Sequence, residues 1–187
     1  MEALVFSHEC IILDACCIIN LYASKQIDFI LRTIPRSVCV AAYVKNEEIL
    51  RTYDVLSNST EDVDLQPLID QGLLFLVELD LETEAEAYVN FSTVLDDGEA
   101  ITGAIALHRN WAIATDDKAA IKIFEREAPQ LQIITTPELI KYWVDTTHPS
   151  FDTVNQCLQN IIIGARYRPN AKHCLYDWWQ SFIKPNG

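Results

Sequence analysis

The stretch TVLDDGEAITGAIALHRNWAIATDDKAAIKIF (93–124) carries acidic residues at both ends of one helix–strand unit. Its five acids form the clusters DDGE and DD, and a largely apolar segment separates them. The pattern predicts a helix from about Gly98 to Arg109, a strand at 111–115 and a second helix at 117–127. The carboxylates are either solvated helix caps or ligands that converge on a metal ion.

Further apolar runs outside this unit predict the rest of a sheet. They are CIIL before Asp14, SVCVA (37–41), LLFLVEL (73–79) and LQIIT (131–135). Strands that alternate with helices indicate the α/β class, with a parallel sheet covered on both faces. Ligands of such sheets bind outside the carboxyl ends of the strands. Asp14 and the pair Asp116–Asp117 follow strands directly and therefore belong to that edge.

Between the second and third of these runs, the sequence predicts a helix and then an irregular segment. Val44 to Tyr53 has helical composition. Residues 54–71 are polar and rich in turn formers, which predicts a loop or an insertion.

Length and composition predict one folded domain. The 187 residues are half hydrophobic, which suits a sizeable core. No apolar run is long enough to span a membrane, and the first residues lack a basic signal-peptide region, so we expect a cytoplasmic protein without membrane association. The six cysteines contain no CxxC pair and predict buried, reduced thiols.

The charge is strongly negative and unevenly distributed. The net charge is −13; residues 1–150 hold 10 basic and 25 acidic residues, while residues 151–187 hold 4 and 2. Between Arg51 and Arg109 there are 13 acids and no base. Such a surface repels nucleic acid, so contact with RNA would need a bound cation and the basic C-terminal segment. The acidic stretch could instead face a basic protein partner.

Acidic residues recur at four element boundaries. Besides Asp14 and Asp116–Asp117, they include the pair Glu47–Glu48 and the pair Asp97 and Glu99. Each residue taken singly is an ordinary helix-cap or first-turn residue. Carboxylates brought together at one sheet edge repel unless a cation neutralises them, and oxygen ligands favour Mg²⁺ or Mn²⁺. Such an ion activates water and stabilises charge on a phosphodiester.

Four motifs in order resemble the PIN-domain ribonucleases, a family that includes toxins of bacterial and archaeal toxin–antitoxin pairs. IILDACCIINLYAS (11–24) resembles the opening strand with the first aspartate of that family. SVCVAAYVKNEEIL (37–50) resembles the second strand and its V-x-x-E helix. DDGEAITGAIAL (96–107) resembles a GEAEAI-type segment, and WAIATDDKAAIKIF (111–124) resembles the D-D-x-x-A strand and helix.

The resemblance implies a three-layer α/β/α fold over residues 1–150 and a metal-dependent endoribonuclease. It implies catalytic roles for Asp14, Glu47, Glu99 and Asp116, and metal ligation by Asp14, Glu99, Asp116 and Asp117. Glu48 remains a rival for Glu47, Asp97 for Glu99, and Asp117 for Asp116. The implied cofactor is Mg²⁺ or Mn²⁺. The implied partners are an RNA substrate, an antitoxin and a second copy of the chain as a homodimer.

The C-terminal segment, residues 151–187, is predicted to be a helical extension packed on the same domain. Arg166, Arg168 and Lys172 are interleaved with aromatic residues, which suits phosphate contact and base stacking. The alternative is a helix that docks its aromatic side chains into the core and leaves the charges in solvent. Thr115 could add a hydroxyl contact to the substrate.

Two other classes of function compete with a nuclease. The first is a non-catalytic PIN-like module that binds a basic protein through its acidic face. The second is phosphoryl transfer, by a phosphatase or a receiver domain. Such phosphatases need D-x-D after the first strand, whereas this chain has Asp14-Ala15-Cys16.

Overall fold

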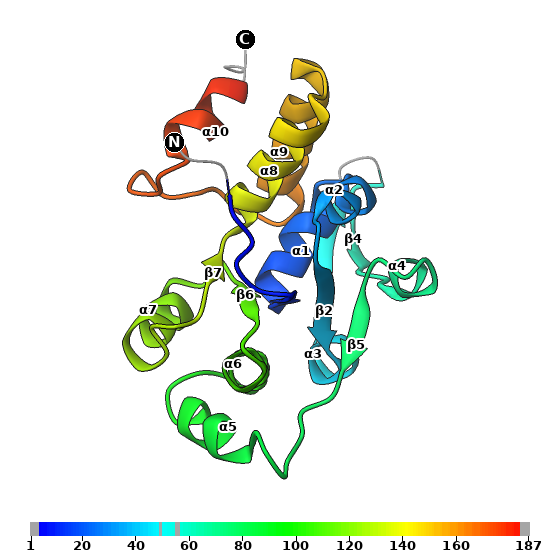
Figure 1. The fold of residues 1–187 in the computed structure, drawn as a ribbon. Helices are drawn as coiled ribbons and strands as arrows, with labels where there is room; N and C mark the ends of the chain where they lie inside the picture. The colour runs from blue at the N-terminus through cyan, green and yellow to red at the C-terminus, as the bar shows by residue number, and fades with distance from the viewer. Residues whose placement is uncertain (1–3, 49, 55–56, 184–187) are drawn as a thin grey trace.

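The computed structural model describes residues 4–48, 50–54 and 57–183, and its centre is a five-stranded parallel sheet. The strand order is β5-β2-β1-β6-β7, and helices lie on both faces (Figure 1). The fold is therefore the expected α/β type, a three-layer α/β/α sandwich. The strands are β1 (Cys10–Leu13), β2 (Ser37–Ala41), β5 (Phe75–Val77), β6 (Ala112–Ala114) and β7 (Ile133–Ile134).

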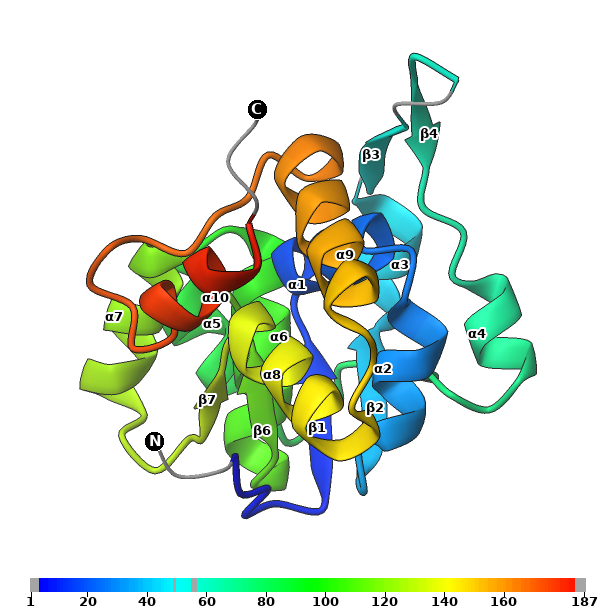
Figure 2. The same cartoon turned by 90° about the horizontal axis from the view of Figure 1, so that it is seen from above.

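The helices form one layer on each face of the sheet (Figures 1 and 2). The upper layer in Figure 1 holds α1 (Ala15–Ala23), α2 (Ile27–Thr33), α8 (Thr136–Thr147), α9 (Phe151–Gly164) and α10 (Tyr176–Phe182). The lower layer holds α3 (Ala42–Glu47), α5 (Ala85–Ser92), α6 (Asp97–Arg109) and α7 (Lys118–Glu127). A short helix, α4 (Gln66–Asp70), lies beside β5.

The two central strands are apolar and buried along their whole length. Every residue of β1 and of β6 is buried, as expected for parallel strands covered on both faces. Leu13 pairs with Val40 on one side and with Ala114 on the other. The backbone N–H of Asp14 donates to the carbonyl of Ala114 at 2.9 Å, so the pairing extends one residue beyond β1. The carboxyl ends of β1 and β6 therefore lie side by side.

The chain changes direction across the sheet at β1. From β1 it proceeds to β2 and then β5 on one side, and it returns through α5 and α6 to β6 on the other side. The gap between the carboxyl ends of β1 and β6 is thus the topological switch point, where open α/β sheets bind their ligands.

The segment after β2 differs from the sequence expectation. The helix predicted to reach Tyr53 ends at Glu47, and Arg51–Asp54 forms β3 instead. β3 pairs antiparallel with β4 (Ser59–Asp62), which lies inside the segment predicted as a loop. A cross-strand pair between Arg51 and Asp62 and a buried Thr52 favour the extended form, because β-branched and paired residues fit a ladder. Residues 49, 55 and 56 lie outside the described part.

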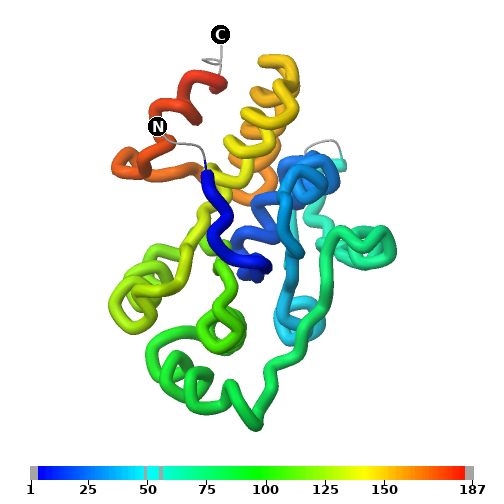
Figure 3. Tube along the Cα trace, in the orientation of Figure 1, coloured from blue at the N-terminus to red at the C-terminus, as the bar shows by residue number. Residues whose placement is uncertain are grey.

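The C-terminal helices α9 and α10 pack against other elements of the upper layer. Helix α9 contacts α1 and β3, and α10 contacts α9. Figure 3 follows the chain from α9 through the irregular segment 165–175 into α10. Trp179 of α10 is fully buried, so at least this aromatic side chain docks into the core. Residues 184–187 lie outside the description, and none of the described helices has the length and apolarity needed to cross a membrane.

Candidate metal centre

Five carboxylates converge at the switch point, and we call Asp14, Glu48, Asp96, Glu99 and Asp117 the acidic cluster. They come from the end of β1, the residue after α3, the start of α6 and the start of α7. Their charges affect one another. The pKa of Glu99 is raised to about 7 by burial, then by the charges of Asp96, Asp14 and Asp117.

Asp14 is the most buried member of the acidic cluster, with 3 % of its surface exposed. Its Oδ1 accepts from the backbone N–H of Ala15 at 2.8 Å, so the residue caps α1 as predicted. Its Oδ2 accepts from the Thr115 hydroxyl at 2.8 Å and from the Cys16 thiol at 3.0 Å. Burial raises the pKa of Asp14 despite these donors, and the charge of Asp96 adds to the rise.

Glu48, and not Glu47, belongs to the acidic cluster. Helix α3 ends at Glu47, and the extended backbone of Glu48 (φ −87°, ψ 143°) takes its side chain to α6. A Cβ atom added to Gly98 would lie 1.6 Å from Glu48 Oε1, so the missing side chain at 98 makes room for this carboxylate. Burial, then the charges of Asp14 and Asp96, raises the pKa of Glu48 to about 7. Glu47 is exposed, and its catalytic role stays a prediction.

The acidic residues at the start of α6 have different surroundings. Asp96 caps the helix, with its Oδ1 accepting from the Glu99 N–H at 2.9 Å. Asp97 accepts from the hydroxyl groups of Tyr88 (3.0 Å) and Tyr43 (3.5 Å). The charge of Asp97 is not among the causes that raise the pKa of Asp14, Glu48 or Glu99. Of the two rivals, Glu99 is the one that lies in the acidic cluster, together with the exposed Asp96.

The adjacent residues Asp116 and Asp117 have different surroundings. Asp116 accepts from the Thr136 N–H (3.0 Å), the Asn20 amide (2.8 Å) and the Tyr167 hydroxyl (2.8 Å), and also from the Thr136 hydroxyl. These donors all belong to the upper layer or to the segment that follows it. Asp117 instead caps α7, accepting from the N–H groups of residues 119 and 120.

Successive side chains of an extended chain point to opposite faces, which explains the divergence of these two aspartates. Asp117 adds its charge to the acidic cluster, whereas Asp116 is satisfied by neutral donors on the other side. The structure therefore brings Asp14, Glu99 and Asp117 together from the predicted set. The ligand and catalytic roles predicted for Asp116 remain predictions.

Thr115 positions the acidic cluster from inside. Its side chain is fully buried, and its hydroxyl donates to Asp14 Oδ2 at 2.8 Å. The same oxygen accepts from the N–H of Asp117 at 3.2 Å. This hydroxyl is occupied within the protein by its contacts with the two aspartates, and its contact with a substrate stays a prediction.

The basic residues of the C-terminal segment are exposed. Arg166, Arg168 and Lys172 lie in the irregular segment between α9 and α10. Tyr167, in the same segment, donates to Asp116 and fixes this part of the segment beside the end of β6. The contact of Arg166, Arg168 and Lys172 with a substrate phosphate stays a prediction.

The acidic cluster is open and not a closed cage. Within residues 4–48, 50–54 and 57–183, the group of metal-ligating side chains whose donor atoms lie within 4.8 Å of one another is Cys16, Cys17 and Asp116. The cluster carboxylates are spaced more widely. Such spacing suits an ion that keeps part of its water shell, as Mg²⁺ does when one or two carboxylates bind it.

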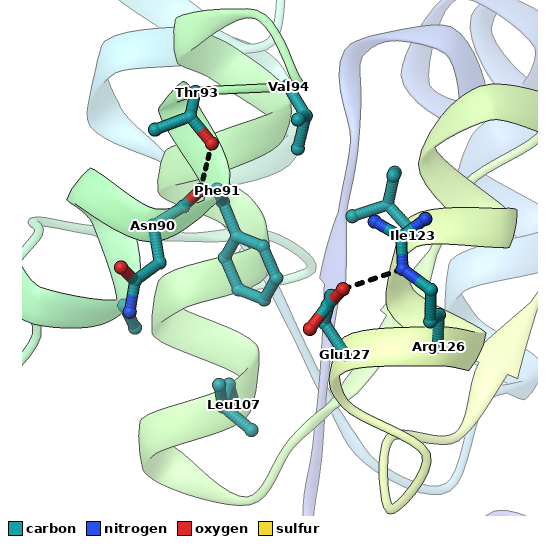
Figure 4. Close-up of a pocket in the computed structure, with 9 residues that line it drawn as sticks. Asn90, Phe91, Thr93, Val94, Leu107, Ile123, Arg126 and Glu127 are labelled. Carbon is teal, nitrogen blue, oxygen red and sulfur yellow. Dashed lines mark hydrogen bonds and ion pairs between the residues drawn. The ribbon is translucent and has the colours of Figure 1, made fainter.

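Of two hollows in the structure, one is lined by a member of the acidic cluster and the other is not. One of about 320 Å³ includes Glu48 in its wall together with Lys45 and Arg51, two cations that sequence reasoning had not assigned to the site. Another of about 350 Å³ lies between α5, α6 and α7 (Figure 4). Its wall contains Phe91, Leu107 and the paired Arg126 and Glu127, and no member of the acidic cluster. The hollow beside Glu48 is therefore the one that adjoins the candidate metal centre.

Comparison of the chain with protein-family models and with curated proteins gives no match. The PIN-domain resemblance therefore rests on the four sequence motifs alone.

Proposed function

We propose that this chain is a PIN-like, Mg²⁺- or Mn²⁺-dependent endoribonuclease whose metal centre is the acidic cluster. The observation that carries the proposal is the convergence of Asp14, Glu48, Asp96, Glu99 and Asp117 at the switch point of a parallel sheet. Four separate elements supply these side chains, which is more than independent helix capping requires.

The charge balance of the acidic cluster supports a bound cation. In the described part of the chain, no ion pair involves a member of the cluster. Burial and mutual repulsion raise the pKa of Glu48 and of Glu99 to about 7, so the ionised site is electrostatically costly on its own. The donors are all carboxylate oxygens, and this set fits a hard divalent ion.

In this proposal, each residue near the acidic cluster has a definite task. Asp14, Glu99 and Asp117 would hold the ion, and Thr115 keeps Asp14 in place. When bound, the ion supplies an activated water and neutralises charge on the phosphodiester. Lys45 and Arg51, beside Glu48, would contact the backbone phosphates of the RNA.

The charge of the domain bears on its partners. A net charge of −15 over residues 1–150 opposes broad RNA affinity and favours a narrow set of structured targets. The same charge would attract a basic antitoxin segment onto the acidic cluster. A role as the toxin of a toxin–antitoxin pair is therefore part of the proposal, and a homodimer remains an expectation from the resemblance.

The test is RNA cleavage in Mn²⁺ and in Mg²⁺ by the wild type, Asp14→Asn and Glu99→Gln. We expect each substitution to reduce the rate by about 10²–10³-fold, the usual effect of removing one electrostatic stabiliser. Asp97→Asn is the matched control, because it removes a carboxylate two residues from Glu99 that the tyrosines hold instead. Equal cleavage by wild type and Asp14→Asn, or no cleavage by any of them, would refute the nuclease.

A second candidate is a non-catalytic module that binds a basic protein through the acidic cluster. The acidic excess of residues 1–150 favours it, because a net charge of −15 attracts a basic partner. The two candidates differ in their response to metal alone. A nuclease centre should raise the melting temperature with added Mn²⁺ and lose that rise in Asp14→Asn, whereas a protein-binding face should show no such rise.

A further inference from the structure

We propose that Cys16, Cys17 and Asp116 form a second metal site that binds zinc, distinct from the acidic cluster. Cys16 and Cys17 lie in the first turn of α1, and Asp116 follows β6. The proposal does not depend on the function proposed above, because its ligands and its metal differ from those of the acidic cluster.

The three donor atoms of this site lie close to one another. All of them are within 4.8 Å of one another, and Cys17 Sγ lies 3.4 Å from Asp116 Oδ2. A sulfur at 2.3 Å and an oxygen at 2.1 Å from a tetrahedral zinc lie roughly 3.6 Å apart. The separation of Cys17 Sγ and Asp116 Oδ2 therefore already matches the one that a shared zinc ion needs.

The ligand type selects the metal. Two thiolates and one carboxylate favour a soft or borderline ion such as Zn²⁺ over Mg²⁺ and Mn²⁺. On binding, the two thiol protons leave to solvent, and the ion replaces the S–H contact between Cys17 and Asp116. The Asn20 amide and the Thr136 N–H would still hold the Asp116 carboxylate, as outer partners do in built metal sites.

Two of the three ligand residues are partly exposed. Cys16 and Asp116 are half-buried, whereas Cys17 is fully buried behind them. Three protein ligands leave the fourth position to water. The other close thiol pair, Cys10 and Cys39, is different: its sulfurs are 3.0 Å apart and both residues are buried, but no third ligand joins them within the described residues.

Zinc at this site would also affect Asp14. The Cys16 thiol donates to Asp14 Oδ2, and the loss of its proton removes one of the three donors to that carboxylate. If the acidic cluster has the function proposed above, zinc would therefore weaken it. The binding experiments below do not require that function.

The first experiment titrates the full-length reduced chain with Co²⁺, a spectroscopic probe for zinc sites. We expect one equivalent to give thiolate-to-cobalt charge-transfer absorption and tetrahedral ligand-field bands, which Zn²⁺ then removes. Cys16→Ser should weaken binding by at least about tenfold. Cys174→Ser, at an exposed cysteine outside the site, should change nothing. Unchanged affinity in Cys16→Ser, or no thiolate band in the wild type, would overturn the proposal.

The second experiment uses the wild type alone, so a folding defect cannot confuse it. Alkylation of Cys16 and Cys174 by iodoacetamide is followed by mass spectrometry, with and without one equivalent of Zn²⁺. We expect zinc to slow alkylation of Cys16 by at least about tenfold and to leave Cys174 unchanged. Mg²⁺ at the same concentration should protect neither residue. Equal alkylation of Cys16 with and without zinc would exclude this site.

Discussion

The buried carboxylates near the two ends of α6 differ in whether they have an ion-pair partner. At its C-terminal end, Glu84 has 1 % of its surface exposed and is paired with Arg109, with Nε–Oε1 at 2.6 Å and Nη2–Oε2 at 3.1 Å. The Asp80 N–H also donates to Glu84 at 2.8 Å. At the N-terminal end, Asp14, Glu48 and Glu99 meet, and no ion pair in the described residues reaches them.

At one end of α6 a buried carboxylate has an ion-pair partner, and at the other end the carboxylates have none among the described residues. The hydrogen bond to Glu84 raises the pKa of Arg109, and each charge stabilises the other. At the other end, burial and repulsion raise the pKa of two glutamates to about 7. Burying acids without a partner is costly, so under the proposed function this end of α6 is where a bound cation would offset the repulsion.

The largest effect should come from breaking the paired end. Arg109→Met leaves Glu84 buried without its cation, and we expect a loss of about 3–5 kcal/mol in the free energy of unfolding. Urea denaturation at pH 7.5 measures it. Removing both partners, in Glu84→Gln with Arg109→Met, should recover much of the loss.

The matched control for this pair is Arg126→Met. Its partner Glu127 is exposed, so we expect a change within about 0.5 kcal/mol. A loss in Arg109→Met no larger than the loss in Arg126→Met would show that the Glu84 pair is not the element that holds this end of α6.

A smaller effect should appear as a pH dependence at the unpaired end. Glu48 and Glu99 have ordinary pKa values of 4.5 and folded-state values of about 7. Between these values the folded state binds more protons than the unfolded state, so their contribution makes the free energy of unfolding fall as the pH rises from about 4.5 to about 7. Denaturation in EDTA at pH 5, 6, 7 and 8 measures this trend.

The comparison of Glu48→Gln with Glu47→Gln makes the pH experiment specific. We expect Glu48→Gln to flatten the fall in stability and Glu47→Gln, at the exposed neighbouring position, to follow the wild type. If the two variants give the same pH profile, the assignment of Glu48 to the acidic cluster is wrong.

The smallest effect concerns the space that Gly98 leaves for Glu48. Gly98→Ala would displace the Glu48 carboxylate, while alanine favours the helix, so we expect little change in stability. Affinity for Mn²⁺ should fall roughly tenfold, as measured by calorimetry. In a Glu48→Gln background the same substitution should cause no further fall. A full additional fall there would show that Gly98 does not act through Glu48.

The strands could be predicted from sequence, and so could the edge of the sheet at which the candidate site lies. Continuous apolar runs such as CIIL and SVCVA are read correctly because a strand buried on both faces admits little else. Asp14 was identified because it directly follows such a run. The β3–β4 hairpin was not predicted, because its residues are polar and its stability comes from cross-strand pairing and the buried Thr52.

The choice between neighbouring acids could not be made from sequence. Glu48 faces Asp14 only because α3 ends one residue earlier, and helix ends are set by packing more than by local pattern. Asp117 faces the acidic cluster because consecutive extended residues alternate in direction, and the sequence does not show which of the two positions points to which layer.

The buried hydroxyl of Thr115 has a consequence for both strand ends. A hydroxyl has a single hydrogen to give, and here Asp14 receives it while a lone pair accepts the amide of Asp117. The torsion that points the hydrogen at Asp14 also sets where the lone pairs point, and so sets the contact with the backbone amide of Asp117. Turning the Thr115 hydroxyl about its Cβ–Oγ1 bond therefore changes its contact with the Asp14 carboxylate and its contact with the Asp117 amide together.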